Sequence, residues 1–266
     1  MPERPPNRYL RLLERIFLSQ YVEGAREVVF HREDIARAAE QLNLKLPSNV
    51  GDVIYSFRYR QDLPHSITSR APKGEEWIIL PAGRSRYRFA ATALSTILPA
   101  SGLVETKVPD ATPGLISMYA LNDEQALLAK LRYSRLIDIF TGLTCYSLQS
   151  HLRTTVRSMG QVETDEIYVG IDKKGVHYVI PVQAKGGADR LSIVQIVQDC
   201  AMGAMKFPAL TCLPVAAQFM ENQVIALFAF DTTSTLPAIL SERHYRLVPP
   251  DQMTPEDLEA YRARID

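Results

Sequence analysis

The chain has 266 residues, which is enough for two domains of ordinary size. Hydrophobic residues make up 46% of it and charged residues 23%, values of an ordinary globular protein that exclude a disordered or fibrous chain. The 30 basic and 30 acidic residues cancel, which argues against a protein that coats nucleic acid through its overall charge. Binding to nucleic acid would therefore have to rest on a local basic patch.

The cysteines and the amino terminus bear on the compartment. Cys145, Cys200 and Cys212 are widely spaced and lack the paired spacing of a zinc or redox site, so a reducing compartment fits best. The first residues, MPERPPNRYLRLLER, are charged and rich in proline, unlike a signal peptide. No apolar run approaches the ~20 residues that a membrane span needs. We expect a cytoplasmic protein with no membrane contact.

Three helices are predicted at the amino-terminal end. Apolar residues recur at helical spacing over residues 7–20, 32–44 and 50–60. Pro5 and Pro6 precede the first helix, and Ser48 or Asn49 is placed to cap the third. A short extended run, EVVF, separates the first two helices. The tight turn before the third helix is typical of a helix-turn-helix.

Two β-rich segments follow these helices. Residues 75–80 (EEWIIL) and 86–90 (RYRFA) are joined by the Pro/Gly turn PAGRS, which predicts a two-stranded wing. Residues 1–95 are therefore predicted to form a winged helix-turn-helix domain that binds DNA. Winged-helix domains also mediate protein contacts. The candidate phosphate-binding residues are Arg58, Arg60, Arg84, Arg86 and Arg88.

The remainder, residues 96–266, is predicted to be one α/β domain that begins with a Pro/Gly-containing linker at 96–122. Residues 123–140 and 146–159 are expected to form one helical layer. The order of helices and strands indicates a mixed central sheet flanked by helices. The expected strands are residues 161–171, 176–185, 209–220 and 223–231, and the later helices are residues 192–207 and 254–264.

Two pairs of polar residues lie on the predicted hairpin of residues 161–185. Side chains two apart on a strand point to one face, so Glu163 and Asp165 project together, as do Gln183 and Lys185. The turn Asp172-Lys173-Lys174-Gly175 folds the strands back on each other. We therefore expect both pairs to lie close together.

This group of side chains suits hydrolysis of a phosphodiester bond. Glu163, Asp165 and Gln183 offer the oxygen ligands that a hard divalent cation prefers, so Mg²⁺ is the expected cofactor, with Mn²⁺ as a substitute. Lys185 can orient or deprotonate the attacking water and offset the charge that grows on the phosphate. Glutamine in place of a third carboxylate lowers the charge of the site by one unit and should weaken metal affinity.

VETDEIYVG followed by YVIPVQAKGG resembles the PD-(D/E)XK nuclease superfamily, in the variant whose catalytic strand has the pattern Q-x-K. The resemblance implies that Asp165 is the metal-binding aspartate, Gln183 the (D/E) position and Lys185 the catalytic lysine. Glu163 matches a glutamate that some families place two residues before the aspartate. The fold implied is restriction-endonuclease-like, a mixed central sheet flanked by helices.

Two neighbouring helices would approach this site. Gln149, His151 and Arg153 lie on the helix predicted before the catalytic strand, where they could line the cleft. The alternative is a structural or exposed position, which is the more common one for a lone histidine. The helix after the strand carries Gln195 and Gln198 and resembles one that approaches DNA in some superfamily members.

The resemblance implies a metal-dependent endonuclease that cleaves double-stranded DNA in restriction or phage defence. Cutting both strands requires two active sites, so a homodimer is expected. A cognate DNA methyltransferase is compatible with such a function. Because Gln183 is not acidic, a catalytically inactive DNA-binding or regulatory protein with the same fold is the first alternative. A transcription regulator that senses a small ligand is the second.

Overall fold

The computed structural model describes residues 8–46, 49–59, 61–121, 124–157, 159–187, 189–234 and 236–264. Contacts divide the chain into two compact units. The first comprises residues 1–95, 155–162 and 192–194, and the second comprises residues 96–154, 163–191 and 195–266. Pro5, Pro6 and Ser48, named above around the predicted helices, lie outside the described residues.

The first unit contains helices and a three-stranded antiparallel sheet in the order β1-β3-β2. The helices predicted from apolar spacing are confirmed, as are the short extended run and the β2–β3 hairpin. Asn49 Oδ1 accepts a hydrogen bond from the N–H of Gly51 (3.0 Å), at the start of α3. In chain order the elements are α1 (Arg8–Gln20), β1 (Glu27–His31), α2 (Arg32–Gln41), α3 (Gly51–Tyr59), α4 (His65–Thr68), β2 (Glu76–Pro81) and β3 (Arg86–Thr92).

The core of this unit forms where α1 packs against the sheet. Phe17 of α1 is fully buried, and its ring lies 5.1 Å from that of Phe89 on β3 and 5.2 Å from that of Trp77 on β2. Edge-to-face contacts of this kind add stability beyond the area that they bury. The apolar stripe of α1 therefore fixes this helix over the sheet.

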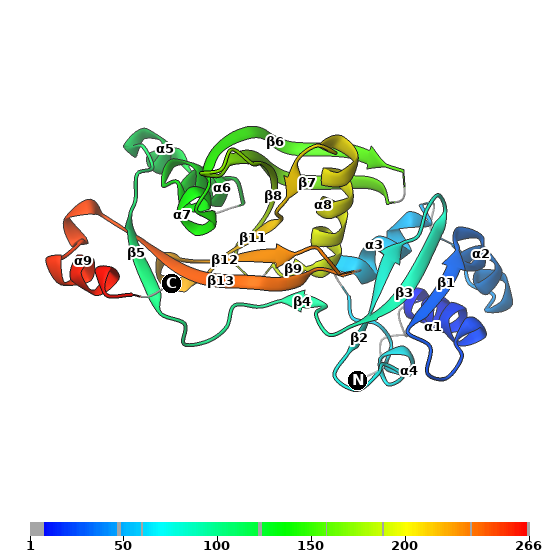
Figure 1. Ribbon diagram of the computed structural model, residues 1–266. Helices are drawn as coiled ribbons and strands as arrows, with labels where there is room; N and C mark the ends of the chain where they lie inside the picture. The colour runs from blue at the N-terminus through cyan, green and yellow to red at the C-terminus, as the bar shows by residue number, and fades with distance from the viewer. Residues whose placement is uncertain are drawn as a thin grey trace. The chain divides into compact units, whose positions relative to one another are not determined.

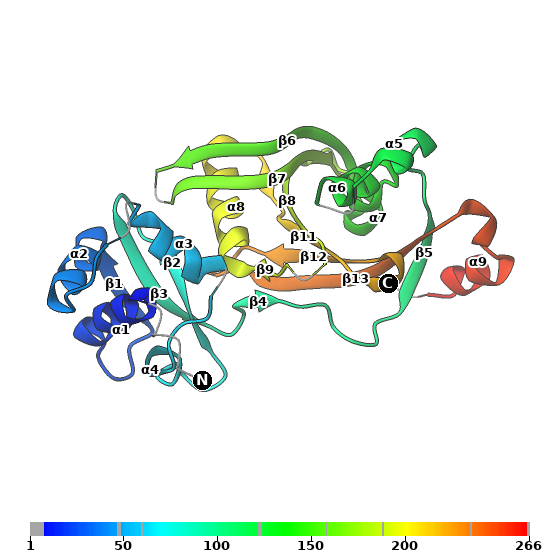
Figure 2. The same cartoon turned by 180° about the vertical axis from the view of Figure 1, so that it is seen from behind.

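The rest of the chain is a mixed α/β structure (Figures 1 and 2). Its large sheet has eight strands, seven of them in the order β5-β13-β12-β11-β8-β7-β6, with β10 beside β8. Strand β8 is parallel to β11 and antiparallel to β7, so the sheet is mixed. The strands of this sheet are β5 (Glu105–Pro109), β6 (Thr144–Val156), β7 (Gly160–Ile171), β8 (His177–Lys185), β10 (Thr211–Cys212), β11 (Val215–Phe219), β12 (Val224–Asp231) and β13 (Ala238–Val248). Strands β4 (Thr96–Ile97) and β9 (Leu191–Ser192) form a separate two-stranded sheet.

Helices flank both faces of the sheet at β8. Ile180, Val182 and Ala184 lie in one hydrophobic core with α6 and α7, whereas Gln183 contacts Asp199 of α8. Alternate residues of a strand face opposite sides, so β8 carries the core on one face and polar contacts on the other. The helical segments are α5 (Gly114–Tyr119), α6 (Glu124–Tyr133), α7 (Leu136–Thr141), α8 (Ile193–Lys206), η1 (Glu221–Gln223), η2 (Pro250–Gln252) and α9 (Pro255–Arg262).

The predicted hairpin is confirmed. Strands β7 and β8 pair antiparallel from Ile171 opposite His177 to Glu166 opposite Val182. Gly175 in the turn has φ +84°, a conformation that glycine adopts without strain. The capped helix at the carboxy-terminal end is also confirmed, because Thr254 Oγ1 accepts a hydrogen bond from the N–H of Asp257.

The predicted helix over residues 146–159 is wrong, because residues 144–156 form strand β6. Gln149, His151 and Arg153 therefore lie on a strand. Cys145 and Val156 near the ends of β6 are buried, but the large apolar residues Tyr146 and Leu148 are 59% and 53% exposed, so burial does not alternate along the whole strand. Its place beside β7 in the sheet overrides the local pattern.

The single helix predicted over residues 123–140 is two helices, with Asp123 outside the described residues. Arg135 has φ +55° and separates α6 from α7, although no glycine or proline marks the break. Strand β13, which no prediction included, pairs with β12 on one side and β5 on the other.

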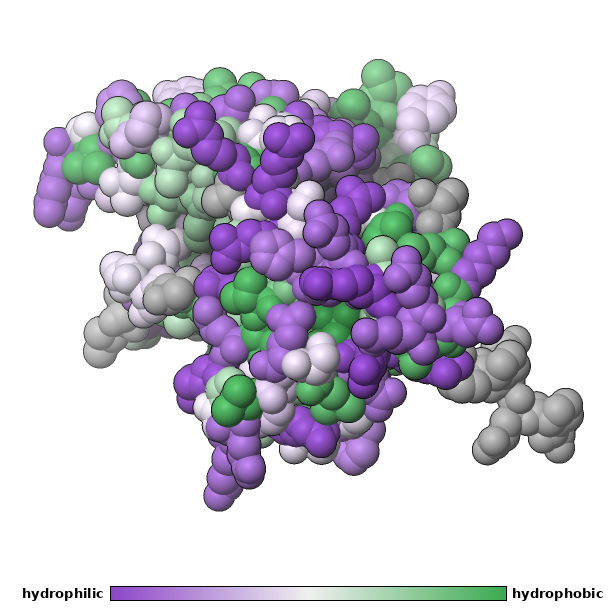
Figure 3. Space-filling view, turned by 90° about the vertical axis from the view of Figure 1, so that its right-hand side faces the viewer, coloured by the Kyte–Doolittle hydropathy of each residue, from purple (hydrophilic) through white to green (hydrophobic). Residues whose placement is uncertain are grey.

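The surface is that of a chain with many charged residues. The face in Figure 3 is mostly hydrophilic, with small hydrophobic areas between. Among the described residues, no helix combines the length and the apolar character needed to cross a membrane.

Candidate functional site

The strands β7 and β8 separate where the polar residues lie. The regular pairing of their backbones reaches Glu166 opposite Val182. Beyond that pair, the carboxylate of Asp165 takes the place of a backbone carbonyl as a hydrogen-bond acceptor. Asp165 Oδ2 accepts the hydrogen bond of the Ala184 N–H at 2.8 Å. This bond holds the Asp165 side chain between the two strands, beside the end of β8.

Asp165, Lys185 and Glu124 form the centre of the candidate site. The ammonium group of Lys185 lies 3.9 Å from Asp165 Oδ2 and also contacts the carboxylate of Glu124, the first residue of α6. The side chains of Asp165 and Lys185 are 13% and 16% exposed, and that of Glu124 is 36% exposed. Two carboxylates thus share one lysine at a partly covered position.

The carboxyl group of Asp165 is held at an unfavourable position for a negative charge. Burial raises its pKa, and the charges of Glu124 and Glu163 raise it further. The hydrogen bond from Ala184 and the charge of Lys185 lower this pKa but do not compensate fully. An additional cation at Asp165 would therefore be stabilising.

Gln183 points away from this centre into a buried polar network. Its Nε2 donates to both carboxylate oxygens of Asp199 (3.2 and 3.0 Å), and its Oε1 accepts from Gln195 Nε2 (3.1 Å). Thr164 Oγ1 also donates to Asp199 (2.5 Å). Asp199 is fully buried, and burial raises its pKa to about 7. The network ties β7 and β8 to α8.

Glu163 has partners on β6. Its Oε2 accepts from Arg153 Nη2 (2.8 Å) and Nε (3.2 Å), and its Oε1 lies 3.0 Å from His151 Nε2. The side chain is 42% exposed. Its carboxylate is therefore paired with two side chains of the neighbouring strand.

Glu166, the residue after Asp165, faces α6. Its Oε1 accepts from Arg132 Nε (2.9 Å) and from Ser147 Oγ (2.6 Å), and the side chain is fully buried. Glu163, Asp165 and Glu166 thus have three separate sets of partners within four residues of one strand.

Of the four predicted site residues, the structure brings Asp165 and Lys185 together. Gln183 and Glu163 have their side chains directed to α8 and β6. The sequence prediction missed Glu124, which lies 61 residues before Lys185 and carries no local signal. It also missed Asp199, although a carboxylate within the apolar segment IVQIVQDCAM is a signal of a buried polar contact.

The residues fit a divalent cation through two carboxylates. Among the described residues no hydrogen bond reaches Asp165 Oδ1, so this oxygen is available as a ligand. Glu124 offers a second carboxylate beside Lys185. Within the same described ranges, no three His, Cys, Asp or Glu side chains are grouped as a metal site. A divalent cation held by two carboxylates would have further coordination positions for water and phosphate.

The candidate phosphate-binding arginines of the first unit differ in exposure. Arg84 and Arg86 are exposed, while Arg88 pairs with Glu27 (2.6 Å). Arg58 donates to the carbonyl of Ile79 (3.1 Å) and lies over the ring of Tyr87. Arg60 lies outside the described residues.

No protein-family model, curated protein or solved structure matches this chain in the comparisons.

Proposed function

We propose that this chain is a metal-dependent endonuclease that hydrolyses phosphodiester bonds of double-stranded DNA. The observation that carries the proposal is the Asp165–Lys185 pair, 3.9 Å apart, with Glu124 on the same lysine. A hydrolytic site of this class needs carboxylates for a cation and a positive group beside the phosphate. The sequence pattern and the contacts agree on the aspartate and the lysine.

In this proposal Asp165 and Glu124 hold Mg²⁺, or Mn²⁺ as a substitute. The bound cation supplies Lewis-acid polarisation of a phosphate oxygen and of water. Lys185 binds the phosphate of the scissile bond and offsets the negative charge that grows on it. Gln183 has a positioning role, because its amide donates to the Glu163 carbonyl of β7 (3.1 Å) and is held by Asp199 and Gln195 of α8.

Residues 1–95 are proposed to be a winged helix-turn-helix domain that binds DNA, and residues 96–266 a restriction-endonuclease-like domain. Exposed Arg84 and Arg86 support the first assignment. The mixed sheet with helices on both faces supports the second. A cytoplasmic homodimer in restriction or phage defence, with a cognate methyltransferase, completes the proposal.

Cleavage assays on purified full-length protein test the function. Supercoiled and linear DNA, methylated and unmethylated, are incubated with Mg²⁺ or Mn²⁺. We expect cleavage by the wild type and by Asp251→Asn, a control at an exposed acid, and none by Asp165→Asn. DNA left intact by the wild type under every condition, with the fold verified, would exclude the proposal.

A second candidate is a catalytically inactive protein of the same architecture that binds DNA. The engagement of Gln183 by Asp199 and Gln195 favours it, because a third oxygen ligand is then missing from the centre. Calorimetric titration with Mn²⁺ separates the two. Binding that is lost in Asp165→Asn supports the nuclease, whereas no binding by the wild type supports the inactive protein.

A further inference from the structure

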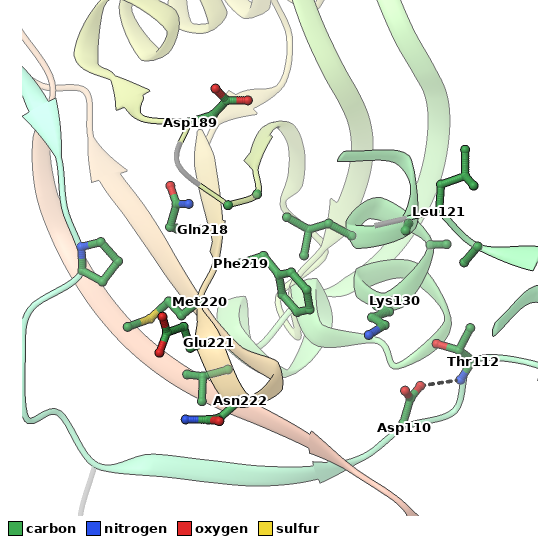
Figure 4. A pocket seen from close by; sticks show the side chains of 18 of the residues that line it. Asp110, Thr112, Leu121, Lys130, Asp189, Gln218, Phe219, Met220, Glu221 and Asn222 are labelled. Atoms are coloured by element: carbon green, nitrogen blue, oxygen red, sulfur yellow. Dashed lines mark hydrogen bonds between the residues drawn. The ribbon is translucent and has the colours of Figure 1, made fainter. Parts of the chain in front are cut away.

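A cavity of about 1030 Å³ lies in the second unit, beyond the ends of β8 and β11 (Figure 4). These strands are parallel, so both end at the same edge, where ligands of α/β sheets commonly bind. Gly186 and Gly187, which directly follow Lys185, line the cavity. Gln218 lines it as well and is the register partner of Lys185 on the neighbouring strand. The cavity therefore adjoins the candidate site.

Gln218 is an unusual polar residue within this cavity. It is 7% exposed, and within the part of the chain that the structure describes no hydrogen bond reaches its side-chain amide. Figure 4 shows the amide directed into the open space below Asp189. Neither atom of the amide is enclosed by protein, so both are open to the cavity itself. The NH₂ group and the carbonyl oxygen of the Gln218 amide are therefore available to a ligand that has a hydrogen-bond acceptor next to a hydrogen-bond donor.

The remaining lining favours a flat, uncharged ligand. Phe219 projects into the cavity with the ammonium group of Lys130 5.0 Å from its ring centroid (Figure 4). Apolar side chains of α5 and α6 line another part of the wall. The charged residues of the lining are four acids and two bases, namely Glu105, Asp110, Asp189, Glu221, Lys130 and Arg190.

This balance of charge disfavours a phosphate inside the cavity. Glu105 is already paired with Arg246, and Asp110 accepts from the Thr112 N–H (2.9 Å). With Glu105 paired, the lining still carries three acids, Asp110, Asp189 and Glu221, against the two bases. A neutral heterocycle fits the cavity better. The phosphate of a nucleotide that carries this heterocycle would lie outside the cavity, toward Lys185.

We propose that the cavity binds an adenine base, with the Gln218 amide hydrogen-bonded to its 6-amino group and N7, and that this base is extruded from DNA beside the scissile phosphate. Glutamine contacts adenine in this bidentate manner, and enzymes that act on DNA can extrude a base into a pocket. The assignment of the base to DNA rests on the proposed endonuclease function. The binding of the base itself does not.

Calorimetry with free adenosine tests the cavity independently of cleavage. We expect full-length wild-type protein to bind adenosine and to bind 7-deazaadenosine, which lacks the N7 acceptor, at least tenfold more weakly. Gln218→Leu should bind adenosine at least tenfold more weakly than wild type. Gln252→Leu, the same change at an exposed glutamine outside the cavity, should bind as wild type does.

The melting temperature separates a ligand-binding role of Gln218 from a structural one. The leucine variant should be as stable as wild type, because no protein hydrogen bond is lost. Gln218→Glu keeps the shape of the side chain and should also bind adenosine more weakly. Failure of wild type to bind adenosine, or equal binding by both Gln218 variants, would overturn the proposal.

Substrates containing 7-deazaadenine at single positions around the mapped cut test the source of the base. A cleavage rate reduced at least tenfold at one position supports a base extruded from DNA. Equal rates at every position overturn this assignment, and adenosine binding would then indicate a free nucleoside as the ligand. If no DNA is cleaved at all, the proposed function fails while the adenosine titration still decides the cavity.

Discussion

Lys185 and Asp165 lie on neighbouring antiparallel strands with 3.9 Å between ammonium nitrogen and carboxylate oxygen, at the position where the ladder between the strands ends. The separation of the strands is what lets the two side chains meet. Val182 and Glu166, the last residues in register, are followed by a hydrogen bond from the backbone of Ala184 to Asp165. The site is thus an irregularity of the sheet and depends on both strands.

Replacement of Lys185 by methionine should remove catalysis and leave the fold intact. Methionine keeps the length and apolar part of the side chain but loses the charge that we propose offsets the transition state. The cleavage rate should fall by about 10²–10⁴-fold. Single-turnover cleavage with protein in excess measures this rate, and DNA affinity in Ca²⁺ should change little. Cleavage at the wild-type rate would remove Lys185 from the mechanism.

Replacement of Glu124 by glutamine tests a residue that the sequence did not suggest. The change removes one of the two carboxylates beside Lys185 while keeping shape. We expect metal affinity and cleavage to fall by about 10- to 100-fold, an effect typical of groups that support a metal site. Raising the Mn²⁺ concentration should restore part of the rate. A loss that no metal concentration restores would argue against a role in metal binding.

Helices and strands could be predicted from the sequence where the spacing of apolar residues marks one buried face or where a glycine marks a turn. Helix α1, with Phe17 buried, and the hairpin with Gly175 are of this kind. The sequence was not sufficient for β6, because its large apolar residues Tyr146 and Leu148 are exposed and do not mark a buried face. It also could not place the break at Arg135, where the chain turns without glycine or proline.

The same distinction holds for the site. Asp165 and Lys185 could be predicted as neighbours because both lie on one hairpin. A regular continuation of the register would place Asp165 opposite Gln183, so the contact with Lys185 itself arises from the end of the ladder. The inward direction of Gln183 depends on Asp199, which belongs to a helix that follows the hairpin. The contact of Glu124 with Lys185 depends on how α6 packs against the sheet. Neither relationship is encoded in a local pattern.

The free energy of unfolding should depend on pH through Asp199. Burial raises the pKa of this carboxyl from 3.8 to about 7, so the folded chain keeps a proton that the unfolded chain releases. This contribution is present in full below pH 3.8 and is lost as pH rises to about 7. The loss is on the order of a few kcal/mol. Urea unfolding of wild type and Asp199→Asn at pH 5 and pH 8, in EDTA, measures it.

The asparagine variant cannot ionise, so its stability should vary less over this range. The comparison between the two pH values within each protein removes the effect of altered hydrogen bonding. An equal pH dependence in both proteins would show that Asp199 is not the group responsible.

Replacement of Glu163 by glutamine separates its two roles. As a metal ligand, Glu163 would be essential for cleavage. As the exposed partner of Arg153 and His151, it should contribute at most about 1 kcal/mol to stability. The contacts favour the second role, so we expect Glu163→Gln to cleave DNA at a rate close to that of the wild type. A loss comparable with that of Asp165→Asn would restore Glu163 as a ligand.

The arginines of the first unit should divide by exposure when each is replaced. Arg84 and Arg86 are exposed, so Arg84→Ala and Arg86→Ala should each weaken DNA binding and reduce its dependence on salt by about one ion. Arg58 donates to the carbonyl of Ile79 and lies over Tyr87, and burial lowers its pKa.

Arg58→Met should therefore act on stability, at a cost of about 1–3 kcal/mol, because the Ile79 carbonyl loses its donor. DNA affinity measured at several salt concentrations, together with urea unfolding of each variant, distinguishes the two effects. To bind phosphate, the Arg58 guanidinium would have to give up its contacts with Ile79 and Tyr87. A steeper loss of DNA affinity in Arg58→Met than in Arg86→Ala, with unchanged stability, would contradict this division.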